Sequence, residues 1–214
     1  MVHPLVDQLR FTRSEFMRGI RGVTDADARR RIEPMTSISW NVGHLAWQEQ
    51  QYFVTWPSGE RPYPDIARDF VSGGPPSTPP LARVLAAWQA ITAAADPWLD
   101  GLGSRDLDAR LVSGGHELKR RYGDLLQRVI YHYWFHIGEN AAIRQQLGHE
   151  RLPQFVGSID TKAPYRPRGL SPSRLQGDES TGPGETGARR MKGQLGAVCA
   201  QRSARSPKRT PRTR

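Results

Sequence analysis

The segment of residues 124–147 limits the fold of this chain more than any other part of the sequence. Its apolar residues recur at helical spacing, and Gly148 follows at the position where glycine commonly ends a helix. Leu125, Val129 and Ile143 share one face, which indicates that this face is buried. We therefore predict a long helix here that packs against other elements of the chain.

Three earlier segments show the same helical spacing, and they are expected at about residues 4–21, from Ser37 or Ser39 to Thr55, and at about 80–95. Residues 57–80 are dense in proline and glycine, which predicts a long connection. We therefore predict an all-α fold, a four-helix bundle in which this connection crosses over. A short extended piece near residues 111–112 fits the pattern, but sheet content is expected to be negligible.

Charge separates the last quarter of the chain from the rest. Residues 1–160 carry 18 Lys and Arg against 18 Asp and Glu, whereas residues 161–214 carry 13 against 3. The second segment also has too few large apolar residues to offset the entropy of ordering it. We therefore predict a helical domain over residues 1–168 and a basic, low-complexity, disordered tail over residues 169–214. Such a tail could contact phosphates, but no aromatic residue is interleaved to stack on bases, so nucleic acid is the less favoured partner.

The sequence favours a reducing compartment and no membrane contact. Cys199 is the one cysteine, and it lies in the basic tail, so the helical domain has no disulfide and no thiolate ligand. No apolar run approaches the roughly 20 residues that span a bilayer, and the first residues lack the pattern of a signal peptide. We expect a cytoplasmic protein.

Two histidines lie one turn apart on the inward face of the 124–147 helix. His132 and His136 are four residues apart, so their imidazoles project in directions about 40° apart. Buried imidazoles need partners, and two readings stay open, metal ligands or hydrogen-bonded core residues. His44 follows Gly43 inside a predicted helix, where a glycine costs about 1 kcal/mol, so a packing or site reason is expected there.

These residues resemble the DinB/YfiT-like superfamily, in its DinB_2-type branch. The stretches that carry the resemblance are SISWNVGHLAWQEQQYF and IYHYWFHIGENAAIRQQLGH, and the similarity covers about residues 5–168. The resemblance implies a four-helix bundle with long crossover connections that binds one divalent metal through three histidines. His44 matches the first ligand, and His132 and His136 match the other two. The remaining histidines, His3, His116 and His149, are expected to be ordinary polar residues.

Helical spacing also suggests roles for residues around the histidines. Glu139, three residues after His136, is expected to act at the site by orienting an imidazole or a bound water, with a plain carboxylate on the helix surface as the alternative. Asn41 and Gln48 are expected to line the pocket, as is Gln51, and Arg128 to meet an anionic group. Three neutral imidazoles leave a coordination position open, as catalytic sites do. Zn²⁺ is the first expectation, with Ni²⁺, Fe²⁺ and Co²⁺ as alternatives.

Characterised relatives join a low-molecular-weight thiol such as mycothiol or bacillithiol to an electrophile, or isomerise maleylpyruvate with mycothiol. The resemblance therefore implies a metal-dependent transferase whose partners are a small-molecule thiol and an electrophile. Hydrolysis by a metal-activated water is the enzymatic alternative. A non-catalytic, stress-related metal-binding protein is the other alternative. Members of the family are often dimers, so a homodimer is also expected.

Overall fold

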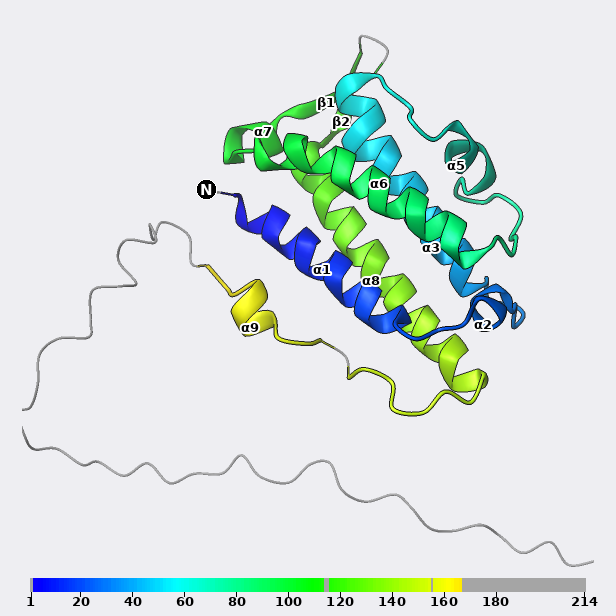
Figure 1. Cartoon of the computed structure of the whole chain (residues 1–214). Coiled ribbons are helices and arrows are strands. Elements are labelled where there is room, and N and C mark those ends of the chain that lie inside the picture. The colour runs from blue at the N-terminus through cyan, green and yellow to red at the C-terminus, as the bar shows by residue number, and fades with distance from the viewer. Residues whose placement is uncertain (1, 114–115, 155, 167–214) are drawn as a thin grey trace, which may run out of the picture. The chain divides into compact units, whose positions relative to one another are not determined.

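The computed structural model describes residues 2–113, 116–154 and 156–166, all within the unit Met1–Arg168. The tail expected at residues 169–214 lies outside the described residues. Four long helices run along one another in the described part of the chain (Figure 1), namely α1 (Pro4–Ile20), α3 (Ile38–Glu49), α6 (Leu81–Asp100) and α8 (Tyr122–Gln146). The all-α bundle predicted from the sequence is thus confirmed.

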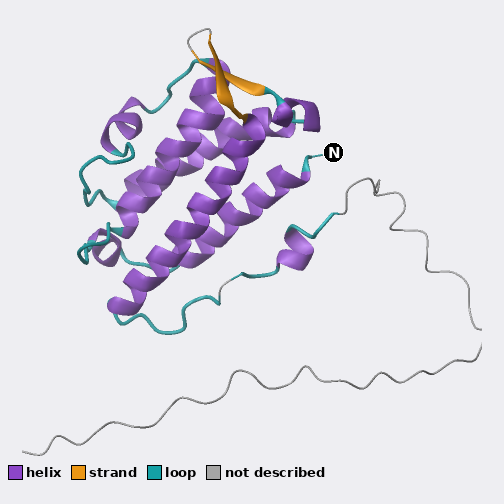
Figure 2. Ribbon diagram, turned by 180° about the vertical axis from the view of Figure 1, so that it is seen from behind, coloured by secondary structure: helices purple, strands orange, loops and turns teal. Residues whose placement is uncertain are grey.

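Short elements join the long helices or follow the last of them. They are α2 (Asp25–Arg29), the π-helix η1 (Gln50–Thr55), α4 (Trp56–Ser58), α5 (Pro64–Asp69), α7 (Ser104–Asp108), β1 (Arg110–Ser113), β2 (His116–Arg121) and α9 (Ile159–Lys162). The two strands pair antiparallel and form a hairpin at one end of the bundle (Figure 2). The extended piece expected near residues 111–112 is part of β1. Sheet is confined to this hairpin among the described residues.

The connection between α3 and α6 is a crossover. Ser37, before α3, donates a hydrogen bond to the carbonyl of Ser77, which lies shortly before α6. At the other end of the same two helices, Phe53 stacks on Trp98. Because α3 and α6 start together and end together, they are parallel, and residues 57–80 return along the length of the bundle. The predicted crossover is confirmed, although this connection also contains the short helix α5, which the proline and glycine content concealed.

Local signals set the ends of the helices that carry the site. The hydroxyl of Ser37, rather than that of Ser39, accepts a hydrogen bond from the backbone N–H of Trp40 and caps α3. Helix α8 ends as expected, because Gly148 adopts a φ of 78° and its N–H donates to the carbonyl of Gln145. These two caps set one end of each helix that carries the clustered histidines, α3 with His44 and α8 with His132 and His136.

Helix α6 is longer than predicted. It was expected to end near residue 95, but it continues through Pro97 to Asp100. A proline inside a helix removes one backbone hydrogen bond and crowds the carbonyl of the residue four positions earlier, which is why an end before Pro97 was expected. Burial of Leu99 in the core favours the additional turn.

A buried polar network ties the four helices together. The guanidinium of Arg13 donates to both carboxylate oxygens of Glu49 at 2.8 and 2.6 Å, and to Asp96 at 2.8 Å. The hydroxyl of Tyr133 donates to Glu49, and the indole of Trp88 donates to that hydroxyl. Burial, together with the charge of Glu49, raises the pKa of Tyr133, which keeps its proton available for donation.

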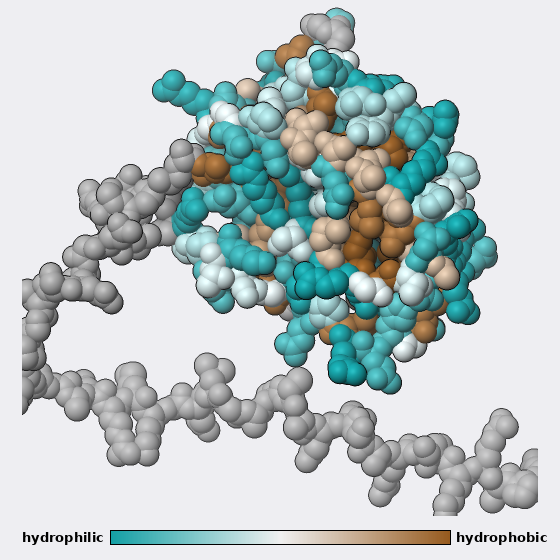
Figure 3. Space-filling view, in the orientation of Figure 1, coloured by the Kyte–Doolittle hydropathy of each residue, from teal (hydrophilic) through white to brown (hydrophobic). Residues whose placement is uncertain are grey.

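One face of the bundle is largely polar. Figure 3 shows hydrophilic residues over most of the face in view, with apolar residues gathered near its middle. Within the described residues, no helix has the length and apolar character needed to cross a membrane.

Candidate metal centre

Three histidines from two helices meet inside the bundle. His44 projects from α3, while His132 and His136 project from successive turns of α8. One ring nitrogen of each lies within 4.8 Å of the corresponding nitrogens of the other two. His44 and His136 are only 5% and 4% exposed, whereas His132 is half-buried. The structure therefore brings together all three residues that the sequence singled out as ligands.

Each imidazole has a hydrogen-bond acceptor at its Nδ1 atom. The acceptor is the carbonyl oxygen of Phe70 for His44, at 2.7 Å. It is the side-chain oxygen of Gln48 for His132 and a carboxylate oxygen of Glu139 for His136, each at 2.8 Å. An acceptor at Nδ1 keeps the proton of a neutral imidazole there and leaves a lone pair on Nε2. All three rings are thus set in the tautomer that ligates through Nε2.

The separation of two Nε2 atoms tests whether these residues fit a metal. Those of His132 and His136 lie 3.0 Å apart. Since both protons are held at Nδ1, two lone pairs face each other at this distance and repel. A cation between them replaces the repulsion by two attractive contacts. The donor set, three imidazoles with no thiolate, fits a divalent ion such as Zn²⁺.

The surroundings keep two of these imidazoles neutral. Burial lowers the pKa of His44 to about 4. Burial also lowers the pKa of His132, to about 3, and the neighbouring imidazoles and the charge of Arg128 act in the same direction. Neutral imidazole is the form that binds metal, so His44 and His132 could bind an ion at neutral pH without displacing protons.

Glu139 lies at the centre of a buried cluster of polar groups. One of its carboxylate oxygens accepts from His136 and from the side-chain amide of Asn41, and the other accepts from the hydroxyl of Thr36. Burial alone would raise the pKa of Glu139, but the hydrogen bond from His136 and the donors of Thr36 lower it below the ordinary value. The carboxylate therefore stays ionised beside His136. Glu139 therefore contacts the three-histidine cluster through His136.

Gly43 lets an aromatic side chain approach α3 closely. A Cβ atom at this position would lie 2.6 Å from two ring atoms of Phe70, which is buried. The carbonyl of Phe70 is also the acceptor for His44. The absence of a side chain at Gly43 therefore allows the connection after α5 to reach His44. This is the packing reason that a glycine inside a helix indicates.

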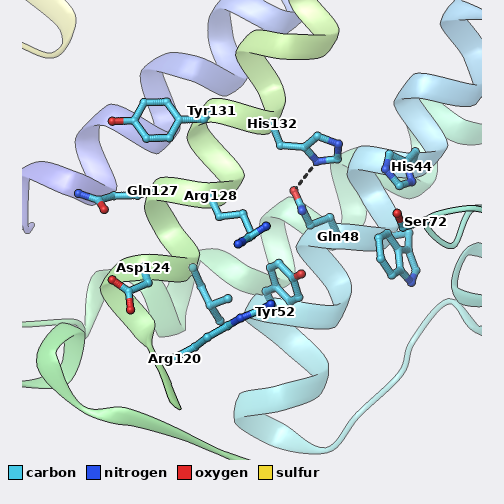
Figure 4. Close-up of a pocket in the computed structure, with 12 residues that line it drawn as sticks. His44, Gln48, Tyr52, Ser72, Arg120, Asp124, Gln127, Arg128, Tyr131 and His132 are labelled. Atoms are coloured by element: carbon cyan, nitrogen blue, oxygen red, sulfur yellow. Dashed lines mark hydrogen bonds between the residues drawn. The ribbon is translucent and has the colours of Figure 1, made fainter. Parts of the chain in front are cut away.

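A cavity of about 780 Å³ opens beside the histidines (Figure 4). Its lining comes mainly from α3, η1, β2 and α8, and it consists of His44, Trp47, Gln48, Tyr52, Ser72, Arg120, Asp124, Leu125, Gln127, Arg128, Tyr131 and His132. The ring of Trp47 stacks on His44, with centroids 5.3 Å apart. The site is therefore open on one side to a space large enough for a small-molecule ligand.

The other residues expected at the site occupy different positions. Gln48 and Arg128 line the cavity, but Asn41 is fully buried and reaches the histidines only through Glu139. Gln51 is not part of the cavity lining described above. Two lining residues, Tyr52 and Arg120, carried no signal in the sequence, because the first lies in a π-helix and the second in a strand.

The three remaining histidines serve elsewhere. His3 caps α1 by accepting from the N–H of Leu5, and His149 lies against Asp27 at the far end of α8. His116 is exposed on β2 and is not in the cavity lining.

Comparison with protein-family models gives a match. A family model for the DinB superfamily matches residues 8–139, which is more than half of the chain and includes all three clustered histidines. The search of curated proteins found no match.

Proposed function

The chain belongs to the DinB superfamily, and on this basis we propose that it is a metal-dependent enzyme that transfers a low-molecular-weight thiol to an electrophile. The ligands in this proposal are His44, His132 and His136. Zn²⁺ is the first candidate ion, ahead of Ni²⁺, Fe²⁺ and Co²⁺, and mycothiol and bacillithiol are the candidate thiols.

One observation carries the proposal. All three Nδ1 atoms have acceptors, so three Nε2 lone pairs are left for one ion, next to an open cavity of about 780 Å³. A structural metal site is usually closed by four protein ligands, whereas a catalytic site keeps a position free for water or substrate. Three ligands beside a cavity support the second kind of site.

The protein residues would prepare the thiol rather than attack the substrate themselves. A divalent ion bound here would lower the pKa of a thiol or of a water molecule. In the transfer the thiol loses its proton, its sulfur forms a bond to the electrophilic carbon, and the leaving group departs with the electrons of the broken bond. Gln48 and Glu139 hold two of the imidazoles in orientation, and Trp47 covers one side of the cavity.

The first test is metal content. Elemental analysis should find close to one ion per chain in the full-length protein purified without a histidine tag, and almost none in His132→Ala. If both proteins contained equally little metal even after reconstitution with each candidate ion, the histidines would be hydrogen-bonded core residues rather than ligands.

The second test is thiol-dependent turnover. The metal-loaded protein should accelerate the reaction of mycothiol or bacillithiol with 1-chloro-2,4-dinitrobenzene, which releases chloride, and His132→Ala should not. Metal-loaded protein that turns over none of the candidate thiols with any of several electrophiles would exclude the transferase. Hydrolysis or a binding role would then be the function to pursue.

A further inference from the structure

Two arginines line the cavity on the side toward β2. Arg128 lies one turn before His132 on α8, and Arg120 lies at the end of β2. Figure 4 shows both side chains extending into the space between α8 and the helix that carries Gln48 and Tyr52. One turn of helix is about 6 Å along the axis, so Arg128 is within reach of a small molecule held at the histidines.

Neither of these guanidinium groups is neutralised by the protein. In the part of the chain that the structure describes, Arg120 and Arg128 form no ion pair and no hydrogen bond, whereas the arginine next in sequence, Arg121, pairs with Asp108. The cavity has one carboxylate in its lining, that of Asp124, and this group accepts a hydrogen bond from the backbone N–H of Arg121. The lining thus has more positive than negative charge, even before an ion is added.

We propose that Arg120 and Arg128 form an anion-binding subsite, so that the molecule bound in this cavity carries a carboxylate one or more helical turns away from the three histidines. This inference rests on the proposed function, in which the other end of the bound molecule is a thiol that would contact the metal. The planar guanidinium group can donate two parallel hydrogen bonds to the two oxygens of a carboxylate, so arginine recognises such a group better than lysine does. Trp47 and Tyr52 provide aromatic walls along the cavity, which suits an apolar middle section of the ligand.

The experiment compares acids with their neutral amides. Isothermal titration of the zinc-loaded full-length protein would measure the dissociation constants of 3-mercaptopropionate and 6-mercaptohexanoate and of the two corresponding primary amides. Hydrogen bonds to charged groups contribute more binding free energy than those to neutral groups. The acid should therefore bind about tenfold more tightly than its amide for at least one chain length. Zinc itself attracts carboxylates, so the preference must also depend on the arginines.

Variants isolate the contribution of the subsite. Arg128→Gln and Arg120→Gln should each reduce the preference for the acid by about threefold or more. Lys119→Gln removes the same charge from the neighbouring position of β2, where the side chain is outside the cavity lining, and should leave the preference unchanged. Equal affinities of acid and amide at both lengths, or an unchanged preference in both arginine variants, would overturn the proposal.

A metal-free arm separates this inference from the proposed function. Hexanoate and hexanamide would be titrated into the metal-free protein, in which no thiol chemistry takes part. An arginine-dependent preference for hexanoate supports the subsite even if the zinc-loaded protein binds no thiol. Conversely, zinc-dependent binding of the thiol amides with no preference for acids in either arm overturns the subsite and leaves the thiol site intact.

Discussion

The carboxylate of Glu139 is the most informative single group to change near the histidines. Replacement by glutamine would remove the negative charge and place an NH₂ group among donors, since His136, Asn41 and Thr36 all donate to this side chain. Loss of such a partner typically weakens metal binding 10- to 100-fold. We expect Glu139→Gln to lower zinc affinity by about this factor, measured by competition with a chromophoric chelator.

The matched control is Glu117→Gln. Glu117 lies exposed on β2 and outside the cavity lining, and its loss changes the net charge by the same amount. Its zinc affinity should remain within about twofold of the wild type, because exposed charges are strongly screened. If Glu139→Gln bound zinc as tightly as this control does, Glu139 would have no positioning role.

The two strongly shifted imidazoles predict how the metal-free protein responds to acid. The pKa is lowered to about 4 in His44 and about 3 in His132, whereas in the unfolded chain both have values near 6.5. Between these values the unfolded chain binds more protons than the folded one, so their contribution to stability is full above about pH 6.5 and falls as the pH decreases. Urea midpoints should therefore drop between pH 6.5 and 5, before most carboxylates titrate.

Zinc should raise the urea midpoint at every pH in this range but leave the acid sensitivity in place. A bound ion would stabilise only the folded state, and the unfolded chain would still take up protons as the pH decreases. A metal-free protein whose urea midpoint stays constant from pH 6.5 to 5 would show that His44 and His132 are not held neutral in the folded state.

At the scale of the elements, Gly43 couples α3 to the crossover connection. An alanine at Gly43 would gain up to about 1 kcal/mol of helix propensity, but its Cβ would collide with the buried ring of Phe70. Overpacking of this kind costs about 1–3 kcal/mol. We expect Gly43→Ala to lower the free energy of unfolding in urea and to weaken zinc binding, because Phe70 also supplies the acceptor for His44.

Gly138 provides the control for this substitution. It lies in the interior of α8, and a Cβ atom there would meet nothing within 4 Å. Gly138→Ala should therefore be neutral or raise the free energy of unfolding by up to about 1 kcal/mol. Equal effects of the two substitutions would mean that the contact between Gly43 and Phe70 does not matter.

The elements also show what the sequence could and could not predict. Helical periodicity and caps are local, so the four long helices and the cluster of His44, His132 and His136 followed from the sequence with its family resemblance. The groups that orient the imidazoles depend on tertiary contacts. Phe70 lies in a connection read only as a loop, and Gln48, expected to line the pocket, also crosses to α8 to accept from His132.

At the scale of the whole molecule, the candidate metal centre and the buried ionic network share two helices through adjacent residues. On α3, Gln48 accepts a hydrogen bond from His132, while Glu49 accepts one from Arg13 in the network. On α8, His132 belongs to the three-histidine cluster, while Tyr133 donates a hydrogen bond to Glu49. Neighbouring residues of a helix project about 100° apart, so each helix presents one residue to each cluster. The register of α3 against α8 is therefore fixed by two independent sets of polar contacts.

This arrangement predicts a strong dependence of stability on Arg13. In Arg13→Met the carboxylate of Glu49, which is 0% exposed, would lose its two charged hydrogen bonds and stay buried. Leaving one partner of a buried pair uncompensated typically costs about 3–5 kcal/mol, and we expect a loss of this size in the free energy of unfolding by urea. Arg10→Met is the control, because Arg10 of α1 pairs with Asp96 and Asp100 of α6 at partly exposed positions, where a pair contributes at most about 1 kcal/mol. If both variants lost the same small amount of stability, the network would not be what holds the four helices in register, and apolar packing alone would set the alignment of α3 and α8 at the three histidines.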